Sequence, residues 1–318
     1  QGWGALAPAA SQALNIAHLM PSLLPRTATQ IARKVLDEDT VPQYNAQLPA
    51  GGRRRKPRAN PLAEIVFFPA CVNAMFGGVD HRGKADETNA SHAFELLCER
   101  AGIEFNIPTG IEAMCCGTPW KSKGFTSGYQ VMSDRVLQNL WLATRGGRLP
   151  VVCDATSCTE GLETMKAKVR AAAEYQTGRS LDADEPDFSR IEFIDAVAFT
   201  AEQILPRLEV KHKLDSLVLH PTCSMTHLGI QPQFEMIAQA LSEDAVVPLN
   251  WGCCAYAGDR GMLHPELTAS ATRAETAEVN AREYAAYASS NRTCEQGMTE
   301  ATGHTYQNIL QLLERATR

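Results

Sequence analysis

Short apolar runs alternate with longer helical patterns along most of the chain. Apolar residues recur at helical spacing in five segments: 5–20, 27–36, 88–101, 128–145 and 262–282. Seven short apolar runs are the expected strands: 64–68, 103–107, 149–153, 191–194, 216–220, 245–249 and 284–289. From residue 61 onward, strands and helices alternate in this way, which is typical of a parallel sheet covered by helices. The pattern predicts an α/β fold.

The first sixty residues form a different kind of segment. Two helical patterns are followed by "PQYNAQLPAGGRRRKPRANP", which is rich in Pro, Gly and Arg and has no apolar periodicity. We expect 1–60 to be a helical connector that ends in an exposed linker. Its basic run, 53–58, is a candidate contact for an acidic partner or a membrane surface, and a solvated linker is the alternative.

The ends of the expected strands repeat one arrangement of cysteines. "FFPAC" and "LHPTC" each end in a cysteine two residues after a proline, the next strand leads to two adjacent cysteines, and the third leads to a lone cysteine. The first series is Cys71, Cys115, Cys116 and Cys158, and the second is Cys223, Cys253, Cys254 and Cys294. We infer a tandem duplication, with pseudo-repeats at 61–210 and 211–318.

These cysteines are candidate metal ligands. Carboxyl ends of parallel strands meet at one edge of a sheet, where helix N-termini favour thiolates. Four converging thiolates suit zinc or an iron–sulfur cluster. Adjacent cysteines fit one tetrahedral ion less well than two irons of a cluster, so the pattern favours iron–sulfur. Zinc and inert buried cysteines are the alternatives.

Composition narrows the function. The chain has 318 residues, ten cysteines, 44% hydrophobic residues and a net charge of -6. This charge gives no reason to expect nucleic acid as a partner, and no window is apolar enough for a transmembrane segment. Ten cysteines are too few for a disulfide scaffold. We expect a cytoplasmic protein, with peripheral contact at the inner face of the membrane as an alternative. The chain does not begin with Met, and we expect it to be part of a longer polypeptide.

The duplicated pattern resembles a known family. Cysteine, then Cys-Cys-Gly, then cysteine resembles the cysteine-rich CCG domain of heterodisulfide reductase, the glycolate oxidase iron–sulfur subunit and lactate-utilisation proteins. The segments "FFPACVNAMFG", "CCGTPWKSKG", "CDATSCTEGL", "HPTCSMTHLG", "WGCCAYAGDRGMLHPELTASAT" and "NRTCEQGM" resemble the C-terminal part of FAD- and iron–sulfur-containing D-lactate or D-2-hydroxyglutarate dehydrogenases.

This resemblance implies an electron-transfer role. Each cysteine series would hold one iron–sulfur cluster, of the 4Fe-4S type, and FAD would bind elsewhere in the full-length protein. Electrons would come from N-terminal flavin and ferredoxin-like domains of the same polypeptide and leave to a quinone or cytochrome-type acceptor. This fragment alone would lack the site that oxidises the D-2-hydroxy acid. The alternatives are a thiol/disulfide redox module like heterodisulfide reductase and a zinc-stapled docking scaffold.

The sequence departs from the family pattern at three positions. Heterodisulfide reductase has a further cysteine three residues before the last ligand, where this chain has Ala155 and Asn291. Cys153 is a candidate fifth ligand with a different spacing, so the departure favours electron transfer over disulfide chemistry. Ala255 replaces the glycine after the second pair, and we expect Gly258 to supply the freedom of that turn.

Several other residues near the cysteines are candidates for a functional role. Asp259, Arg260 and His264 are candidates to tune a cluster or contact an acceptor, and an Asp-Arg pair that caps the next helix is the alternative. Phe68 replaces His220 in the first repeat, which favours packing for His220 over ligation. His227, like His220, flanks Cys223. We expect Cys98 to belong to the core. The turn with Trp120, Lys121 and Lys123 either binds an anion or is solvated.

Overall fold

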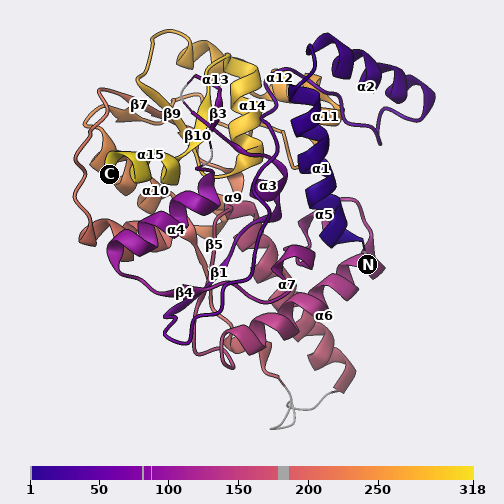
Figure 1. Ribbon diagram of the computed structural model, residues 1–318, viewed down its shortest axis with the longest axis vertical. Helices are drawn as coiled ribbons and strands as arrows, with labels where there is room; N and C mark the ends of the chain where they lie inside the picture. Colours follow the sequence, from indigo (N-terminus) through magenta and orange to yellow (C-terminus); the bar gives the residue numbers. More distant parts are fainter. Residues whose placement is uncertain (1, 81, 87, 178–185) are drawn as a thin grey trace.

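The computed structural model describes residues 2–80, 82–86, 88–177 and 186–318 (Figure 1). Two helices begin the chain, α1 (Trp3–His18) and α2 (Leu23–Val35). The rest is built on two four-stranded sheets in which every pairing is parallel. The predicted α/β fold and helical N-terminal segment are confirmed.

The first sheet has the strand order β4-β1-β5-β6. Its strands are β1 (Ile65–Phe68), β4 (Phe105–Asn106), β5 (Val151–Cys153) and β6 (Phe193–Asp195). In the register, Phe68 lies beside Cys153, and Cys153 lies beside Asp195. The loops that follow β1 and β5 therefore leave the sheet at one level of its carboxyl edge.

The second sheet has the order β10-β9-β7-β8. Its strands are β7 (Leu217–Leu219), β8 (Ala245–Val246), β9 (Ala286–Ser289) and β10 (Tyr306–Asn308). Numbered along the chain within its own half, each sheet has the order 2-1-3-4. This shared topology accords with the inferred duplication, while the boundaries at 61–210 and 211–318 stay a prediction.

Helices connect and cover the strands. In the first half they are α3 (Cys71–Met75), α4 (Ala90–Ala101), α5 (Thr118–Ser122), α6 (Thr126–Ala143), α7 (Thr156–Thr177) and α8 (Ala196–Phe199), with the π-helical turn η3 (Thr200–Ile204) and the 3-10 turns η1 (Ile111–Ala113), η2 (Phe188–Arg190) and η4 (Leu205–Arg207). In the second half they are α9 (Cys223–Leu228), α10 (Gln231–Leu241), α11 (Arg260–Leu263), α12 (Pro265–Ala271), α13 (Arg273–Val279), α14 (Arg292–Thr302) and α15 (Ile309–Ala316). A small antiparallel pair, β2 (Gly78–Val79) and β3 (Ala85–Asp86), lies beside the second half.

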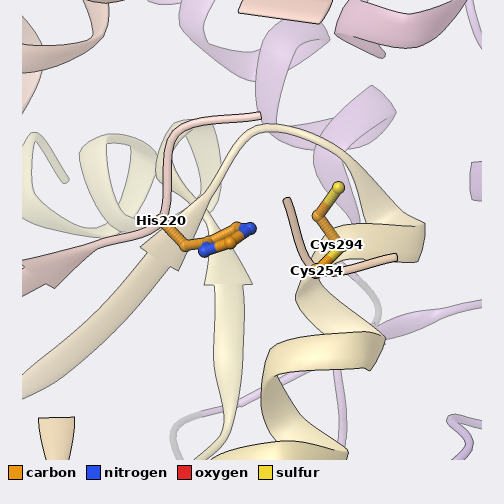
Figure 2. A group of neighbouring side chains, drawn as sticks. All are labelled: His220, Cys254 and Cys294. Carbon is orange, nitrogen blue, oxygen red and sulfur yellow. The ribbon is translucent and has the colours of Figure 1, made fainter. Parts of the chain in front are cut away.

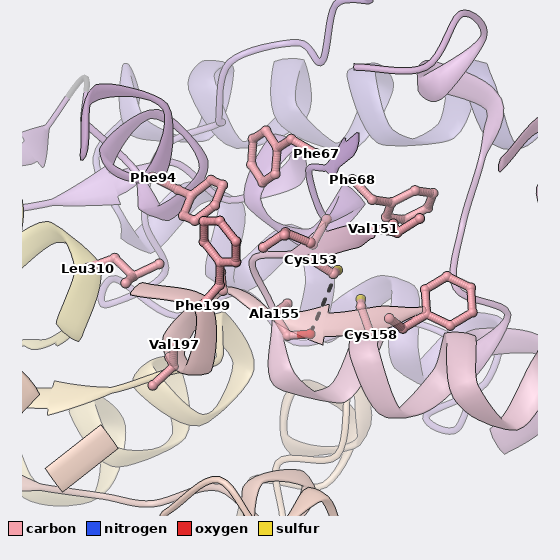
Figure 3. Packing of buried hydrophobic residues seen from close by; sticks show 14 of the residues in the cluster. Phe67, Phe68, Phe94, Val151, Cys153, Ala155, Cys158, Val197, Phe199 and Leu310 are labelled. Atoms are coloured by element: carbon pink, nitrogen blue, oxygen red, sulfur yellow. Dashed lines mark hydrogen bonds between the residues drawn. The ribbon is translucent and has the colours of Figure 1, made fainter. Parts of the chain in front are cut away.

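The two halves pack reciprocally through their helices. In the first half, α4 contacts α15 of the second, and α10 of the second half contacts α8 and η3 of the first. The largest hydrophobic cluster contains residues of both sheets and of these helices. Figure 3 shows part of it, where Phe94 lies between Phe67 and Phe199. The halves therefore share one core.

Three expected elements differ from the structure. The strand expected at 245–249 ends at Val246, because Pro248 has no N–H to donate to a ladder. The helix expected at 262–282 is three short helices, α11, α12 and α13, with Pro265 at the start of α12. The sequence analysis missed β10, whose polar residues Gln307 and Asn308 are buried through hydrogen bonds with Val79 and Glu295.

The expected exposed linker is wrong in part. Arg53 and Arg54 are exposed, but Tyr44, Leu48 and Arg55 are buried. The reason is that a buried guanidinium can satisfy several backbone carbonyls at once, and Arg55 does so against the first cysteine series.

Candidate metal centres

The first cysteine series comes together in space, and we call it centre 1 (Cys71, Cys115, Cys116 and Cys158). Cys71 is the first residue of α3 and Cys158 lies in the first turn of α7, so both sit at helix N-termini that follow strands. The sulfurs of Cys71 and Cys115 are 3.8 Å apart, and those of Cys116 and Cys158 are 3.2 Å apart. Four thiols from three loops thus form one cluster of soft ligands.

Centre 1 is buried at the edge of the hydrophobic core. All four cysteines are buried, and Figure 3 shows Cys158 next to Cys153 beside the packed phenylalanines. The Cys153 thiol donates to the Ala155 carbonyl at 4.0 Å, and its proximity helps to raise the pKa of Cys158. The structure therefore places Cys153 against centre 1, although it ends strand β5 and does not lie in a loop.

The pKa values of the thiols in centre 1 are shifted in opposite directions. Hydrogen bonds from Cys115 and Cys158, with further support from Thr118, hold the pKa of the Cys116 thiol well below its usual range. Burial and the neighbouring thiols raise the pKa of Cys115. A cluster that favours thiolate at Cys71 and Cys116 and raises the pKa of the other two thiols would gain from a cation that lets all of them ionise.

The second series also converges, and we call it centre 2 (Cys223, Cys253, Cys254 and Cys294). Cys223 is the first residue of α9 and Cys294 lies in the first turn of α14, matching the places of Cys71 and Cys158. Cys254 Sγ and Cys294 Sγ lie within 4.8 Å of each other, and Cys223 and Cys253 shift each other's pKa in opposite directions. Cys254 is buried, but Cys253 is exposed and the other two are half-buried. Centre 2 is therefore the one that solvent or a partner can reach.

The adjacent pair in centre 2 has acidic thiols. The hydrogen bond from Cys223 lowers the pKa of Cys253 to about 6. The hydrogen bond from Cys294, with help from His220, lowers the pKa of Cys254 to about 5. Both thiols are therefore mostly thiolate at neutral pH, which is the form that binds metal.

A buried ion pair borders centre 2. Figure 2 shows the His220 ring directed toward Cys254 and Cys294, and one ligand atom from each of the three lies within 4.8 Å of the others. Glu275 of α13 accepts at 2.7 Å from His220 Nδ1. Burial alone would lower the pKa of His220, but hydrogen bonds to Cys254 and Glu275 raise it to about 9. His220 is packed, as predicted, but it is packed against the thiols.

The loop that carries the second pair is held in a strained conformation. Ala255 adopts φ +54 and Ala257 φ +41, while the equivalent of Ala255 in the first half is Gly117 at φ +82. Gly258, at φ +77, supplies only part of the turn, so Ala255 itself takes the left-handed conformation that the sequence analysis assigned to Gly258 alone. Such strain persists only where surrounding contacts fix the loop.

Buried polar groups brace the loops of centre 1. Arg55 donates to the carbonyl of Pro69, just before Cys71, and to that of Met114, just before Cys115. Asp154 accepts from the backbone N–H of Ala70 at 2.6 Å and so joins the loops after β1 and β5. The sequence analysis missed both roles, because neither residue belongs to a recognisable motif.

Side chains next to the cysteines join the two centres. Glu160, two residues after Cys158, accepts from Ser224, the neighbour of Cys223, at 2.7 Å, and pairs with His227 at 2.9 Å. Ser157 donates to Asn291 at 3.1 Å, and these residues precede Cys158 and Cys294. The carboxyl edges of the two sheets therefore face each other across a polar seam.

Asp259, Arg260 and His264, the candidates for tuning a cluster, follow the second cysteine pair and are exposed or half-buried. Asp259 pairs with Lys123 at 2.9 Å, which links the turns after the two cysteine pairs. Asp259 is the N-cap residue of α11, as the capping alternative expects, but its side chain makes no capping hydrogen bond. His264 contacts Asp39 at 2.7 Å and Glu266 at 3.1 Å, and these carboxylates raise its pKa. Arg260 begins α11, and a tuning role for the three stays a prediction.

Two further predictions concern residues outside the centres. Cys98 lies on α4 and is fully buried, so its assignment to the core is confirmed. Trp120 packs against Trp3 of α1 with ring centroids 4.6 Å apart. An anion site at Lys121 and Lys123 stays a prediction, and Lys123 is already paired with Asp259.

The comparisons with known proteins bear on centre 1. Residues 65–163 match the family model of the CCG cysteine-rich domain, a stretch that contains all four cysteines of centre 1. No curated protein matched the chain. The match and the clustered cysteines together indicate a metal-binding or redox role. In the described part of the chain, no helix has the length and apolarity needed to cross a bilayer.

Proposed function

We propose that this chain is the iron–sulfur electron-transfer part of a flavin-dependent D-2-hydroxy acid dehydrogenase of the D-lactate type. The observation that carries the proposal is that two series of four cysteines occupy matching places in two sheets of one topology. Clusters bound there would supply one-electron carriers. In this proposal, FAD in another domain of the full-length protein oxidises the substrate.

The donor sets fit this role. Each centre offers four thiols at helix N-termini, where backbone N–H groups stabilise thiolate and sulfide. Centre 1 is buried and centre 2 is partly exposed, which suits electron entry through preceding flavin and ferredoxin-like domains and exit at centre 2. A quinone or a cytochrome-type protein is the acceptor class that we propose for this exit.

The test is iron and acid-labile sulfide per chain after anaerobic reconstitution, with EPR on the reduced protein. We expect about eight iron and eight sulfide, one four-iron cluster in each centre. Cys253→Ser/Cys254→Ser should remove about half of the iron. Cys98→Ser, which changes a buried cysteine outside both centres, is the matched control and should remove none. If Cys98→Ser loses iron while Cys253→Ser/Cys254→Ser retains it, the assignment of the ligands is contradicted.

Zinc binding is the second candidate, and one observation favours it. For Zn–S bonds of about 2.3 Å, a tetrahedral zinc ion places its sulfurs about 3.8 Å apart. In centre 1 the Cys71–Cys115 separation of 3.8 Å equals this value, while the Cys116–Cys158 separation of 3.2 Å is shorter. Stoichiometric zinc, with iron refused even without oxygen, would replace the electron-transfer proposal by a structural docking scaffold.

We also propose that the helical connector places the protein at the inner face of the membrane. The turn between α1 and α2 exposes Leu19 and Met20, and the start of α2 exposes Leu23 and Leu24. Residues 1–36 contain Arg26, Arg33 and Lys34 but no acidic residue. Exposed leucines beside basic residues are typical of segments that bind anionic lipid surfaces.

A further inference from the structure

His220 and Glu275 form a buried acid–imidazole pair that electron transfer by eight cysteines does not require. Their side chains are 1% and 2% exposed, and His220 Nδ1 lies 2.7 Å from Glu275 Oε1. Burying a charged pair costs free energy unless further contacts compensate for it. A pair placed against thiolates therefore calls for a role at centre 2.

Glu275 holds the imidazole in one orientation. Because Nδ1 is engaged by Glu275, Nε2 is the nitrogen left to face the thiols of Cys254 and Cys294. The other oxygen of Glu275 accepts from the backbone N–H of Gly252 at 3.4 Å, just before the cysteine pair. A carboxylate that binds the distal nitrogen of an imidazole is the usual outer contact of a metal-ligating histidine.

The two halves differ at this position. His220 follows β7 and corresponds to Phe68 in "FFPAC", which packs into the core of the first half. Centre 1 has a fifth sulfur instead, because Cys153 lies against Cys158. The duplicated scaffold thus offers only thiols in one centre, and thiols with one imidazole in the other.

We propose that His220 ligates metal through Nε2, together with Cys254 and Cys294, so that centre 2 is a mixed imidazole–thiolate site. The inference rests on the proposed function only in requiring metal at centre 2. Imidazole in place of thiolate raises the reduction potential of an iron–sulfur centre. Centre 2 would then be the more oxidising of the two, which favours electron flow from centre 1 toward the exposed centre.

The experiment is pulsed EPR on the reduced, reconstituted protein, with a parallel titration by Co²⁺. The wild-type protein should show strong nitrogen hyperfine coupling that changes when histidine is labelled with ¹⁵N. His220→Cys should keep the iron content, lose this coupling and shift one potential to a more negative value. His227→Ala alters a neighbouring exposed histidine and should change neither the nitrogen coupling nor the reduction potentials. Absence of the coupling in the wild type, or its persistence in His220→Cys, would overturn the proposal.

The Co²⁺ titration separates this proposal from the iron–sulfur assignment. If the protein refuses iron but binds two Co²⁺ ions, His220→Phe, which copies Phe68, should weaken one site and leave the other unchanged. Glu275→Gln should weaken that site by about 10- to 100-fold, because the outer contact is lost while the ligands remain. Equal Co²⁺ binding by the wild type and His220→Phe would overturn ligation by His220 whatever metal the protein carries.

Discussion

Arg55 shows how one buried side chain can organise a metal centre from outside its ligands. Its guanidinium satisfies the carbonyls of Pro69, Glu112 and Met114, so it joins the loops that carry Cys71 and Cys115. Its positive charge also favours the Cys71 thiolate, although the hydrogen bond to Cys115 contributes more to the lowered pKa.

We expect Arg55→Ala to lower the free energy of unfolding by about 2–4 kcal/mol, because it leaves three buried carbonyls without a donor. The same change should reduce iron uptake by centre 1, measured by denaturant unfolding and by iron analysis in a Cys253→Ser/Cys254→Ser background. Arg54→Ala removes an exposed neighbour and should stay within about 0.5 kcal/mol of the parent. If the two alanine variants behave alike, Arg55 does not brace the centre.

Asp195 is a buried carboxyl at the start of α8 whose titration should affect stability. Burial raises its pKa to about 7, despite hydrogen bonds from Val197 N–H and Thr159 Oγ1. The unfolded chain loses this proton near the ordinary pKa of 3.8, and the folded chain keeps it to about pH 7. Between these values folding takes up a proton, so stability falls as the pH rises.

We therefore expect the Asp195 carboxyl to lower the unfolding free energy by about 1.4 kcal/mol per pH unit in this interval, with no further loss above pH 7. Asp195→Asn keeps the cap acceptor but cannot ionise, and its stability should fall less steeply. Urea unfolding at several values between pH 5 and 8 measures both slopes. Parallel profiles for the two proteins would mean that the carboxyl does not titrate in this range.

The sequence predicts the residues that can carry chemistry better than those that hold them in place. The thiols of each series converge as expected, because the strand ends they follow share an edge. Glu275, Arg55 and Asp154 gave no signal, since each acts across 14 to 84 residues of sequence through the fold. Such partners depend on tertiary packing, which local patterns do not encode.

At the level of elements, prediction succeeded where apolar periodicity was strong. The helices expected at 88–101 and 128–145 appear as α4 and α6, and the strand expected at 149–153 as β5. β10 was missed because its polar side chains are satisfied by hydrogen bonds from distant segments. The expected linker was misjudged for a related reason: its buried Arg55 finds partners only in the folded protein.

The turn between α1 and α2 carries the prediction for membrane association. Leu19, in this turn, and Leu23, the first residue of α2, are 87% and 70% exposed. We expect sedimentation with vesicles that contain phosphatidylglycerol, and weaker binding to phosphatidylcholine alone. Leu19→Ser/Leu23→Ser should weaken binding at least about tenfold, because two apolar side chains no longer enter the lipid.

Leu249→Ser is the matched control for that experiment. Leu249 is 96% exposed but belongs to the second half, away from the helical connector. It should bind vesicles as the wild type does. Equal weakening in the control and the double variant would mean that any exposed leucine suffices, and the helices would then have no special part in binding.

At the level of the whole molecule, two halves with the same sheet topology place two unlike centres on facing edges. Helices of each half pack against helices of the other in a shared core. The carboxyl edges of the two sheets are joined by hydrogen bonds of Glu160 with Ser224 and His227. One centre is buried and the other is partly open. A pair of redox sites arranged in this way can accept electrons internally and release them at the surface, provided the sites are close enough to exchange electrons.

The contacts across the polar seam lead to a measurable prediction. One hydrogen bond, from Ser224 to Glu160, joins the neighbour of Cys223 to a residue two positions beyond Cys158. Paramagnetic centres separated by so little protein interact magnetically. When both centres are reduced, we expect the EPR spectrum to be broadened and split by this interaction.

Single-centre variants provide the comparison. Cys253→Ser/Cys254→Ser should leave the unsplit spectrum of centre 1, and Cys115→Ser/Cys116→Ser that of centre 2. If the wild-type spectrum equals the sum of the two, the centres do not interact, and the polar seam would serve stability alone. Splitting that appears only when both centres are filled would support electron exchange across the seam. Glu160→Gln should then leave the splitting in place, because the distance between the centres is set by the packing of α7 against α9 and not by the charge on Glu160.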